Sequence, residues 1–400
     1  MKQIQPILGK RGTLFFLVII SAFPPLTMDL YLPALPTMVE VLQTNQAMVN
    51  LTLSAYFITY AIGLLFWGPL SEKFGRKAIL LTGIFIYVTA SLCCGFSSSV
   101  EHLILFRVFQ AFGGSAITVV ATAVIKDLYD GREREKIMAT IMSLVIIAPM
   151  VAPVLGAFLL KVASWHMMFF TLAIFGMFSA LFALCYSETL PSRYTGSILR
   201  SWGRLGVVLK HRKFVFLLAI FCIVPMALMA FLAAGSYIYI NHFNLTEQEF
   251  SYAFAFNAFF ASFGPVIYIK LSKVISVQRV ITMCFLILLI VGFITFTYGM
   301  SSPWLFAGLA APATLAVIMM RIPGTNLMLD QHDTDTGSVV AIIQFSSMVF
   351  GALGMTIVSL YPEALIESLG VIQFSIGLLG GIGWLLIKKR DFVADKLVKI

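Results

Sequence analysis

Twelve long apolar stretches constrain this chain more than any other feature of its sequence. A helix needs about 20 mainly apolar residues to cross the hydrocarbon core of a bilayer. In lipid the backbone must satisfy its own hydrogen bonds, which a helix does, and the stretches are too long and too apolar for tilted strands. We therefore predict an all-α membrane protein with twelve transmembrane helices. The predicted spans are Thr13–Leu35, Val49–Leu70, Ala78–Phe96, His102–Ile125, Ile137–Leu160, His166–Tyr186, Phe214–Asn241, Phe250–Ile269, Val280–Met300, Trp304–Leu327, Gly337–Leu360 and Leu369–Ile387.

Composition excludes a water-soluble domain. Of the 400 residues, 60% are hydrophobic and 11% are charged, whereas soluble globular chains carry roughly 25% charged residues. All but three of the 27 Lys and Arg residues fall in segments that would face one side of the membrane. Loops rich in Lys and Arg stay in the cytoplasm, so both termini are predicted there. These loops account for the net charge of +9, and no nucleic-acid partner is needed to explain it.

The chain divides into two halves of six spans each. We predict a bundle over 1–187, a cytoplasmic linker over 188–213 and a second bundle over 214–400. In the linker, Ile198, Trp202, Leu205 and Leu209 recur at helical spacing, which favours an amphipathic helix on the membrane surface over a merely solvated connection. "GPLSEKFGRKAILLTG" from Gly68 and "GPVIYIKLSKVISVQRVITM" after the eighth span form a faint repeat. Two parallel six-helix halves around a central site are a transporter architecture.

Two charged residues inside the spans are candidates for proton coupling. Asp29 is the acid that lies clearly within a span, and Arg107 lies at a similar depth in the fourth. Burial disfavours the charged carboxylate, whereas a neighbouring guanidinium favours it. We expect the two to pair directly or through water, and Asp29 to exchange a proton as its access to water changes. An ion pair that only joins the first and fourth helices, or an Arg107 that snorkels to the surface, remains an alternative.

Several polar and aromatic residues in the spans are candidates for substrate binding. Arg107, Gln110, Gly114 and Thr118 fall on one helix face, which could be a cavity wall or a helix-packing seam. Interhelical hydrogen bonds and interfacial anchoring are the competing explanations for the other candidates. The full set of predicted substrate contacts is Asp29, Tyr56, Tyr60, Arg107, Gln110, Gly114, Met142, Tyr237, Asn241, Asn257 and Gln344.

The sequence offers no sign of an enzyme or of a nucleotide-driven pump. It contains no G-x-x-x-x-G-K-[ST] phosphate loop, no cluster with metal-ligand spacing and no nucleophile motif. We predict no cofactor and no metal. What remains is movement of a small molecule driven by an ion gradient, with the proton favoured because a single carboxylate suffices to carry it.

Three motifs give the chain a resemblance to the major facilitator superfamily, and specifically to its twelve-helix drug:proton antiporters. "GPLSEKFGRKAIL" resembles the inner loop between helices two and three, with Glu72 where an aspartate is usual. "RVFQAFGGSA" resembles the R-x-x-Q-G motif of helix four, and "APMVAPVLGA" the antiporter motif of helix five. "MDLYLPALP" is similar to the first helix of the bicyclomycin and chloramphenicol resistance (Bcr/CflA) group.

The resemblance implies roles for these residues. Glu72 would sit against the N-terminal end of helix eleven and lock a cytoplasmic gate, and the prolines of helix five would let it bend as the halves rock. The implied gating set is Gly68, Glu72, Gly75, Arg76, Pro149, Pro153 and Gly156. We expect a monomeric, proton-coupled exporter of amphipathic compounds in the inner membrane, with small molecules, protons and the lipid bilayer as its partners. A dedicated exporter of one metabolite, such as an amino acid or a siderophore, and an uptake symporter are the alternatives.

Overall fold

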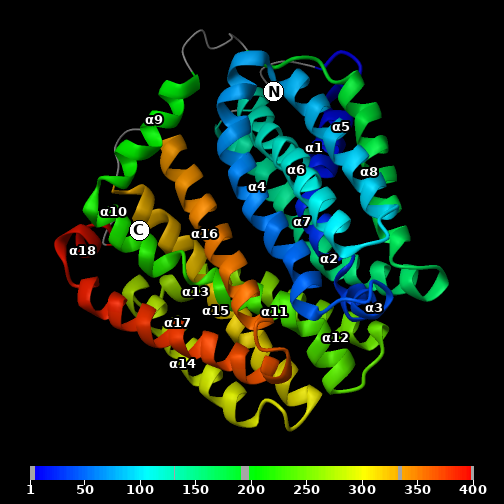
Figure 1. Cartoon of the computed structure of the whole chain (residues 1–400). Helices are drawn as coiled ribbons and strands as arrows, with labels where there is room; N and C mark the ends of the chain where they lie inside the picture. Colours follow the sequence, from blue (N-terminus) through cyan, green and yellow to red (C-terminus); the bar gives the residue numbers. More distant parts are fainter. Residues whose placement is uncertain (1–4, 130, 191–197, 332–335, 398–400) are drawn as a thin grey trace. The chain divides into compact units, whose positions relative to one another are not determined.

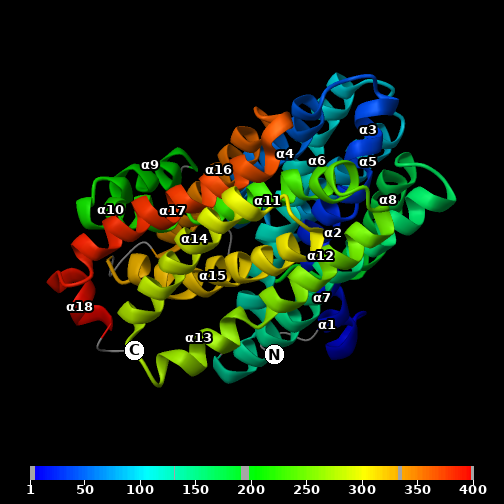
Figure 2. The same ribbon diagram turned by 90° about the horizontal axis from the view of Figure 1, so that it is seen from below.

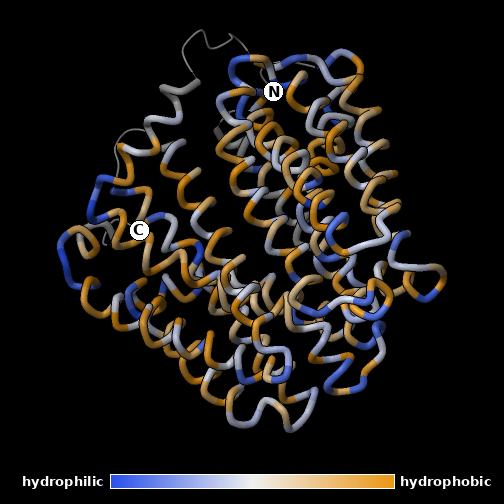
Figure 3. The backbone as a smooth tube through the Cα atoms, in the orientation of Figure 1, coloured by the Kyte–Doolittle hydropathy of each residue, from blue (hydrophilic) through white to orange (hydrophobic). Residues whose placement is uncertain are grey.

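The computed structural model describes residues 5–129, 131–190, 198–331 and 336–397 (Figure 1). Helices make up 86% of the structure and the described ranges contain no strand, which confirms the predicted all-α class. The chain forms two compact units, Met1–Ser201 and Trp202–Ile400. Figure 3 shows hydrophobic residues along the lengths of the helices and many hydrophilic ones in the connections between them.

The described residues contain eleven helical segments that are long and apolar enough to cross a membrane. The predicted fifth span falls on α7, whose shorter apolar part is Ile147–Val162. The elements of the first unit are α1 (Gly9–Ser21), α2 (Phe23–Asp29), η1 (Leu32–Ala34), α3 (Leu35–Val41), α4 (Gln46–Phe74), α5 (Arg76–Gly95), α6 (Val100–Leu128), α7 (Gly131–Val162) and α8 (His166–Cys185). The linker helix predicted from its apolar spacing is present as α9 (Ile198–Leu209).

The first span is broken, contrary to the single helix predicted over Thr13–Leu35. Prolines explain the break, because Pro33 has no N–H to donate to the carbonyl of Asp29 four residues earlier. The α-helical pattern therefore ends at Asp29, and the backbone passes through a short 3-10 turn before α3 begins at Leu35. The consequence is that the one predicted intramembrane acid sits at a helix end.

Close packing of α5 against α6 builds the centre of the first unit. A Cβ atom on Gly113 would lie 2.6 Å from the backbone nitrogen of Tyr87, and one on Gly83 would lie 2.6 Å from the Cβ of Ala116. Glycine is therefore required at this crossing, where it lets the two backbones approach. This approach brings the polar side chains of α5 and α6 into one buried layer.

The second unit repeats the pattern of proline-broken spans. The seventh and eighth spans, predicted as single helices, are each divided, at Pro225 and close to Pro265. Figure 2 shows α14 and α17 side by side, and a Cβ on Gly292 would meet the backbone nitrogen of Phe374 across that contact. The elements are α10 (Arg212–Phe221), α11 (Pro225–Tyr237), η2 (Ile238–His242, a π-helix), α12 (Glu247–Ser262), α13 (Gly264–Ser272), α14 (Val277–Tyr298), α15 (Pro303–Leu329), α16 (Thr336–Ser359), η3 (Pro362–Ala364), α17 (Leu365–Ile387) and α18 (Asp391–Leu397).

Candidate functional site

Arg107 is the most heavily enclosed charge in the described part of the first unit. Its side chain has no exposed surface, and its guanidinium carbon lies 4.6 Å from the ring centre of Tyr31 and 4.3 Å from that of Tyr56. A desolvated cation held between two aromatic faces gains about 2 kcal/mol or more from such contacts. The aromatic rings thus replace part of the hydration that the buried guanidinium has lost.

Neutral acceptors take up most of the remaining hydrogen-bonding capacity of Arg107. Nη1 donates to Gln110 Oε1 at 2.6 Å and to the carbonyl of Thr27 at 3.4 Å, and Nη2 donates to the hydroxyl of Tyr31 at 3.2 Å. The Thr27 carbonyl lies in the last turn of α2, where helix carbonyls lack partners within the helix. Nε of Arg107 is buried and has no hydrogen-bond partner. The guanidinium therefore retains one unused donor.

A chain of hydrogen bonds extends from Arg107 across α5 and α6. Gln110 Nε2 donates to Ser91 Oγ at 2.7 Å, and Ser91 Oγ donates to the Tyr87 carbonyl at 2.7 Å. The Tyr87 hydroxyl in turn shares a hydrogen bond of 2.6 Å with Thr27 Oγ1, on α2. These bonds fix Gln110, so the acceptor that faces Arg107 is held in place. A buried network of hydrogen bonds of this kind favours one arrangement of the helices.

Asp29 and Arg107 do not form a direct ion pair, the first of the two arrangements expected from the sequence, which were a direct pair and a pair bridged by water. No side chain in the described ranges bonds to the Asp29 carboxylate, and the residue is only 6% exposed. The cause is local, because the guanidinium is directed to the Thr27 carbonyl and to Met28 Sδ, 3.8 Å away, at the end of α2. The buried acid and the buried cation thus lie on neighbouring parts of the structure without neutralising each other by a direct bond.

The backbone next to Asp29 is in contact with the antiporter-like motif of α7. A Cβ on Gly156 would lie 1.8 Å from the Leu30 carbonyl oxygen and 2.9 Å from its carbonyl carbon. Pro149 and Pro153 are inside the same helix, about two turns and one turn before this contact. Gly156 is therefore a predicted gating residue that the structure brings against the segment carrying Asp29.

The predicted cavity face of α6 is occupied by aromatic side chains. The rings of Tyr56 and Tyr60 are stacked with centres 5.8 Å apart, and Tyr60 donates to Thr118 Oγ1 at 2.6 Å. A Cβ on Gly114 would lie 3.2 Å from the Tyr56 hydroxyl. Both tyrosines are at least 97% buried. This face of α6 is a tightly packed seam with α4 in the present structure, and its polar groups lie within that seam.

A second polar cluster surrounds the turn between α4 and α5, at the loop motif. Gly75 has a φ of 103°, which side-chain-bearing residues rarely adopt, and it starts α5 without a capping side chain. The Glu188 carboxylate supplies the cap from far along the chain, accepting from the backbone N–H groups of Arg76 and Lys77 at 3.1 Å each. Arg76 Nε bonds to Asp127 Oδ2 at 3.0 Å in an ion pair between largely buried side chains.

Asp127 and Glu188 were not among the predicted functional residues. Both acids occur where apolar spans end, Asp127 after the fourth span and Glu188 after the sixth. Their position in the sequence could have identified them as partners of Arg76. Arg76 lies at the start of the third span, and a charge there needs a partner at the same end of the bundle. Glu72, the predicted gate acid, is exposed on α4, and Gly68 lies one turn before it.

Replacing Glu188 should destabilise the first unit. Its carboxylate accepts from four backbone N–H groups, those of Arg76, Lys77, Thr189 and Leu190. We expect Glu188→Ala to lower the free energy of unfolding by about 2 kcal/mol, the scale of a lost helix cap and of charge-assisted hydrogen bonds. Thermal unfolding of the purified protein in detergent measures this. Glu40→Ala, which removes an exposed carboxylate from α3, is the control. Equal melting temperatures for the two variants would contradict the capping role.

The predicted residues of the second unit occupy different environments. Tyr237 is buried at the end of α11, and Asn257 is 5% exposed on α12 with no partner for its Oδ1 atom. Asn241 is exposed in the π-helix η2, and Gln344 is exposed on α16. Met142, a predicted contact of the first unit, lies in α7, and its side chain is outside the described part of the structure. Asn257 is thus the buried amide of this group with an acceptor still available.

Comparison with known proteins supports a transporter assignment. The family model described as "Major Facilitator Superfamily" matches residues 15–355. An uncharacterized MFS-type transporter of Bacillus subtilis is 28% identical over 94% of this chain and 95% of its own length. A bicyclomycin resistance protein homolog of Haemophilus influenzae is 30% identical over 64% of this chain and 66% of its own length. A chloramphenicol resistance protein of Pseudomonas aeruginosa is 36% identical over 47% of this chain and 45% of its own length.

Solved structures share the fold. A mutant form of the nucleoside transporter NupG matches with a TM-score of 0.78 and 13% identity, covering 94% of this chain and all of that one. A D-xylose–proton symporter matches with a TM-score of 0.74 and 11% identity over 93% of this chain and 96% of that one. The family match covers most of the sequence, and the all-helical fold agrees with it. The chain is a multi-pass membrane transporter, not an enzyme, and belongs to the Major Facilitator Superfamily.

Proposed function

We propose that this transporter exports drugs or other amphipathic small molecules across the inner membrane in exchange for protons, by alternating access. The observation that carries the proposal is Asp29, a buried carboxylate to which no described side chain bonds, placed at the break that ends α2. Charged residues inside a membrane protein mark ion and proton pathways, because their burial is costly without such a role. The relatives named for bicyclomycin and chloramphenicol resistance support a drug as the exchanged solute.

Arg107 has a supporting role in this proposal. Its guanidinium is fully buried and retains an unused Nε donor. A rotation of α2 or α6 could break the hydrogen bond from Arg107 Nη1 to the Thr27 carbonyl. Arg107 would then have a second free N–H donor, which could bond to the Asp29 carboxylate. Arg107 would then stabilise the charged form of Asp29 in the conformation in which the two side chains are bonded, and would not stabilise it in the other conformation. Asp29 and Arg107 are therefore assigned to proton coupling.

The remaining assignments follow from position. Twelve transmembrane helices and a monomeric state are proposed, and both termini are proposed to lie in the cytoplasm. The one-sided distribution of Lys and Arg supports this placement of the termini. The α4–α5 turn and the proline-containing α7 are proposed as the gate elements, with Gly68, Glu72, Gly75, Arg76, Pro149, Pro153 and Gly156 as the residues concerned. Substrate contacts are proposed for Asp29, Tyr56, Tyr60, Arg107, Gln110, Gly114, Met142, Tyr237, Asn241, Asn257 and Gln344.

The direction of an imposed pH gradient tests the coupling. Chloramphenicol is uncharged near neutral pH, so a pH gradient alone does not concentrate it inside a vesicle. Proteoliposomes with an acidic lumen should accumulate radiolabelled chloramphenicol, because outward proton flow through an antiporter drives the drug inward whichever way the protein is inserted. Protein-free liposomes should not. A symporter would require the opposite gradient, so accumulation only when the exterior is acidic would overturn the antiport proposal.

The same vesicles separate a drug exporter from a dedicated metabolite exporter. Drug-induced release of protons from the lumen should occur with several unrelated amphipathic compounds. A panel of amino acids and siderophores should give no proton release and should not compete with chloramphenicol. Exchange with one of these metabolites alone would replace the proposed substrate class while leaving proton coupling in place.

A further inference from the structure

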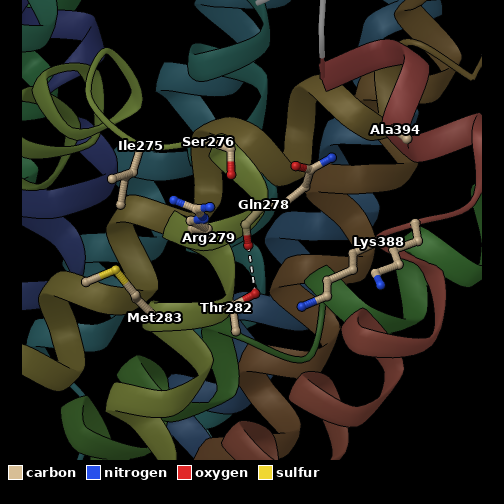
Figure 4. Close-up of a pocket in the computed structure, with 9 residues that line it drawn as sticks. Ile275, Ser276, Gln278, Arg279, Thr282, Met283, Lys388 and Ala394 are labelled. Atoms are coloured by element: carbon tan, nitrogen blue, oxygen red, sulfur yellow. Dashed lines mark hydrogen bonds between the residues drawn. The ribbon is translucent and has the colours of Figure 1, made fainter.

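One cavity in the second unit lies away from the residues assigned to transport. Its volume is about 720 Å³, and it is formed by the start of α14, the end of α17 and the following helix α18. We call it the basic pocket. It is lined by Ile275, Ser276, Gln278, Arg279, Thr282, Met283, Lys388, Lys389 and Ala394 (Figure 4).

Hydrogen bonds from a buried tryptophan hold two walls of the basic pocket together. Trp384, on α17, has no exposed surface, and its Nε1 donates to Thr282 Oγ1 at 3.1 Å and to the Gln278 carbonyl at 3.4 Å. Figure 4 also shows the Thr282 hydroxyl bonded to that same carbonyl, 2.7 Å away. The first turn of α14 is thereby fixed against the last turn of α17. The pocket is therefore a built feature of the fold.

The charge of the basic pocket is of one sign. Arg279, Lys388 and Lys389 line it, and no acid does among the residues whose side chains the structure describes. Among the described side chains, which end at Ala394, none of these three cations has a carboxylate within 4.0 Å. The nearby Asp391 is exposed at the start of α18 and does not line the pocket. The N-terminal end of α14 adds a partial positive charge at the same place, with its N-cap hydroxyl of Ser276 bonded to no backbone N–H. The pocket is thus built to receive an anion.

An apolar stripe on α14 runs away from the basic pocket along the helix. Met283, which lines the pocket, is 46% exposed, and Leu286, Ile290 and Phe293 follow it with exposures of 52%, 46% and 57%. Their spacing of three, four and three residues places them on one side of the helix. A free phosphate would use only the cations, whereas an amphiphile with an anionic head would use both the cations and this stripe.

We propose that the basic pocket binds the phosphate-bearing headgroup of an anionic membrane phospholipid, with an acyl chain along the exposed stripe of α14. Lys and Arg near a bilayer surface attract anionic lipid, and basic pockets between transmembrane helices accommodate such headgroups. The headgroup would neutralise the three like charges and join the ends of α14, α17 and α18. This site is independent of the proton-coupling residues, so its test does not depend on transport.

Lipid binding is measured on the purified full-length protein in detergent. Dioleoylphosphatidylglycerol should raise the melting temperature and remain bound in native mass spectrometry, whereas dioleoylphosphatidylcholine, with the same acyl chains and no net charge, should do neither. The triple variant Arg279→Gln, Lys388→Gln, Lys389→Gln should bind phosphatidylglycerol about 100-fold more weakly, since each surface cation contributes roughly a fivefold gain. The control triple Lys210→Gln, Lys270→Gln, Lys273→Gln changes the net charge equally but leaves the pocket intact, and should bind like the parent.

Four outcomes would overturn the proposal. They are equal binding of the two lipids, an equal loss in the control triple, protection by inorganic phosphate as strong as by phosphatidylglycerol, and wild-type affinity in the pocket triple. The third outcome would identify a site for a free phosphate instead of a lipid. If the pocket triple does not purify, Lys388→Gln alone should weaken phosphatidylglycerol binding about fivefold, and unchanged binding by that variant would count equally against the site.

Discussion

Proteoliposomes containing the Asp29→Asn variant will accumulate no chloramphenicol against its gradient when the lumen is acidic, whereas wild-type vesicles will. Asparagine keeps the size and the hydrogen-bonding shape of the side chain but cannot gain or lose a proton. Asp29 forms no salt bridge with any described residue. Removing its charge therefore breaks no salt bridge and leaves no buried cation without its partner. The variant is therefore expected to fold and to lose only the coupling, with uptake falling to the level of protein-free liposomes.

A separate measurement of drug binding distinguishes a loss of proton coupling from a loss of the binding site. Asp29→Asn should still bind an uncharged drug within a few-fold of the parent affinity, as followed by quenching of tryptophan fluorescence at fixed pH. Glu101→Gln makes the same carboxylate-to-amide change at an exposed position in the first turn of α6, and should transport normally. Uphill accumulation by Asp29→Asn with an unchanged ratio of protons to drug would refute the proton-carrying role.

The long spans of the chain were predictable because hydrophobic length is a strong local signal. The predicted spans Val49–Leu70 and His102–Ile125 fall within α4 and α6, which extend a few residues beyond them at each end. Both helices begin at a capping side chain: Asn45 accepts from the Met48 N–H group before α4, and Ser99 accepts from the His102 N–H group before α6. Hydropathy does not detect such ends, because it measures transfer to lipid and not capping.

Breaks within spans were missed for a related reason. A single proline hardly changes the mean hydropathy of a stretch of about 20 residues. Pro33 and Pro225 nevertheless each remove a backbone donor, and an α-helix is interrupted at each of them. The fragment that ends at Asp29 was therefore predicted as continuous helix. A break of this kind shows only in the backbone hydrogen bonds taken residue by residue, where each proline leaves one carbonyl without a donor.

The surroundings of the buried charges could not be derived from spacing alone. Sequence placed Asp29 and Arg107 at a similar depth, which made a direct pair reasonable. Which way a long side chain points depends on what surrounds it. The ring of Tyr31 comes from the turn before η1 and that of Tyr56 from α4. The cap of α5 by Glu188 likewise joins residues more than 100 positions apart. Contacts of that range depend on how helices pack, and a single sequence does not encode them in any local pattern.

Gly156→Ala is expected to reduce coupled transport strongly by displacing the backbone next to Asp29. The new Cβ would start 1.8 Å from the Leu30 carbonyl oxygen, a distance that no pair of unbonded heavy atoms tolerates. Since the obstacle is backbone and not a flexible side chain, α7 or the turn after α2 must move by more than about 1 Å. We expect the free energy of unfolding to fall by about 1–3 kcal/mol, as for other overpacked positions. Drug uptake driven by the acidic lumen should fall at least about tenfold, the effect of shifting a functional group by that distance.

A matched glycine separates displacement at the site from the general effect of adding a methyl group to a helix. A Cβ on Gly308, inside α15, would meet no atom within 4 Å, so Gly308→Ala should transport normally and gain up to about 1 kcal/mol of helix stability. The ratio of protons released to drug taken up is the second measurement, because a protein that is only less stable loses activity without changing that ratio. A lowered ratio in Gly156→Ala would mean that the contact of α7 with Leu30 positions the Asp29 carboxylate for proton exchange. Normal uptake with a normal ratio would show instead that α2 and α7 separate at no cost to transport, and Gly156 would then have no part in coupling.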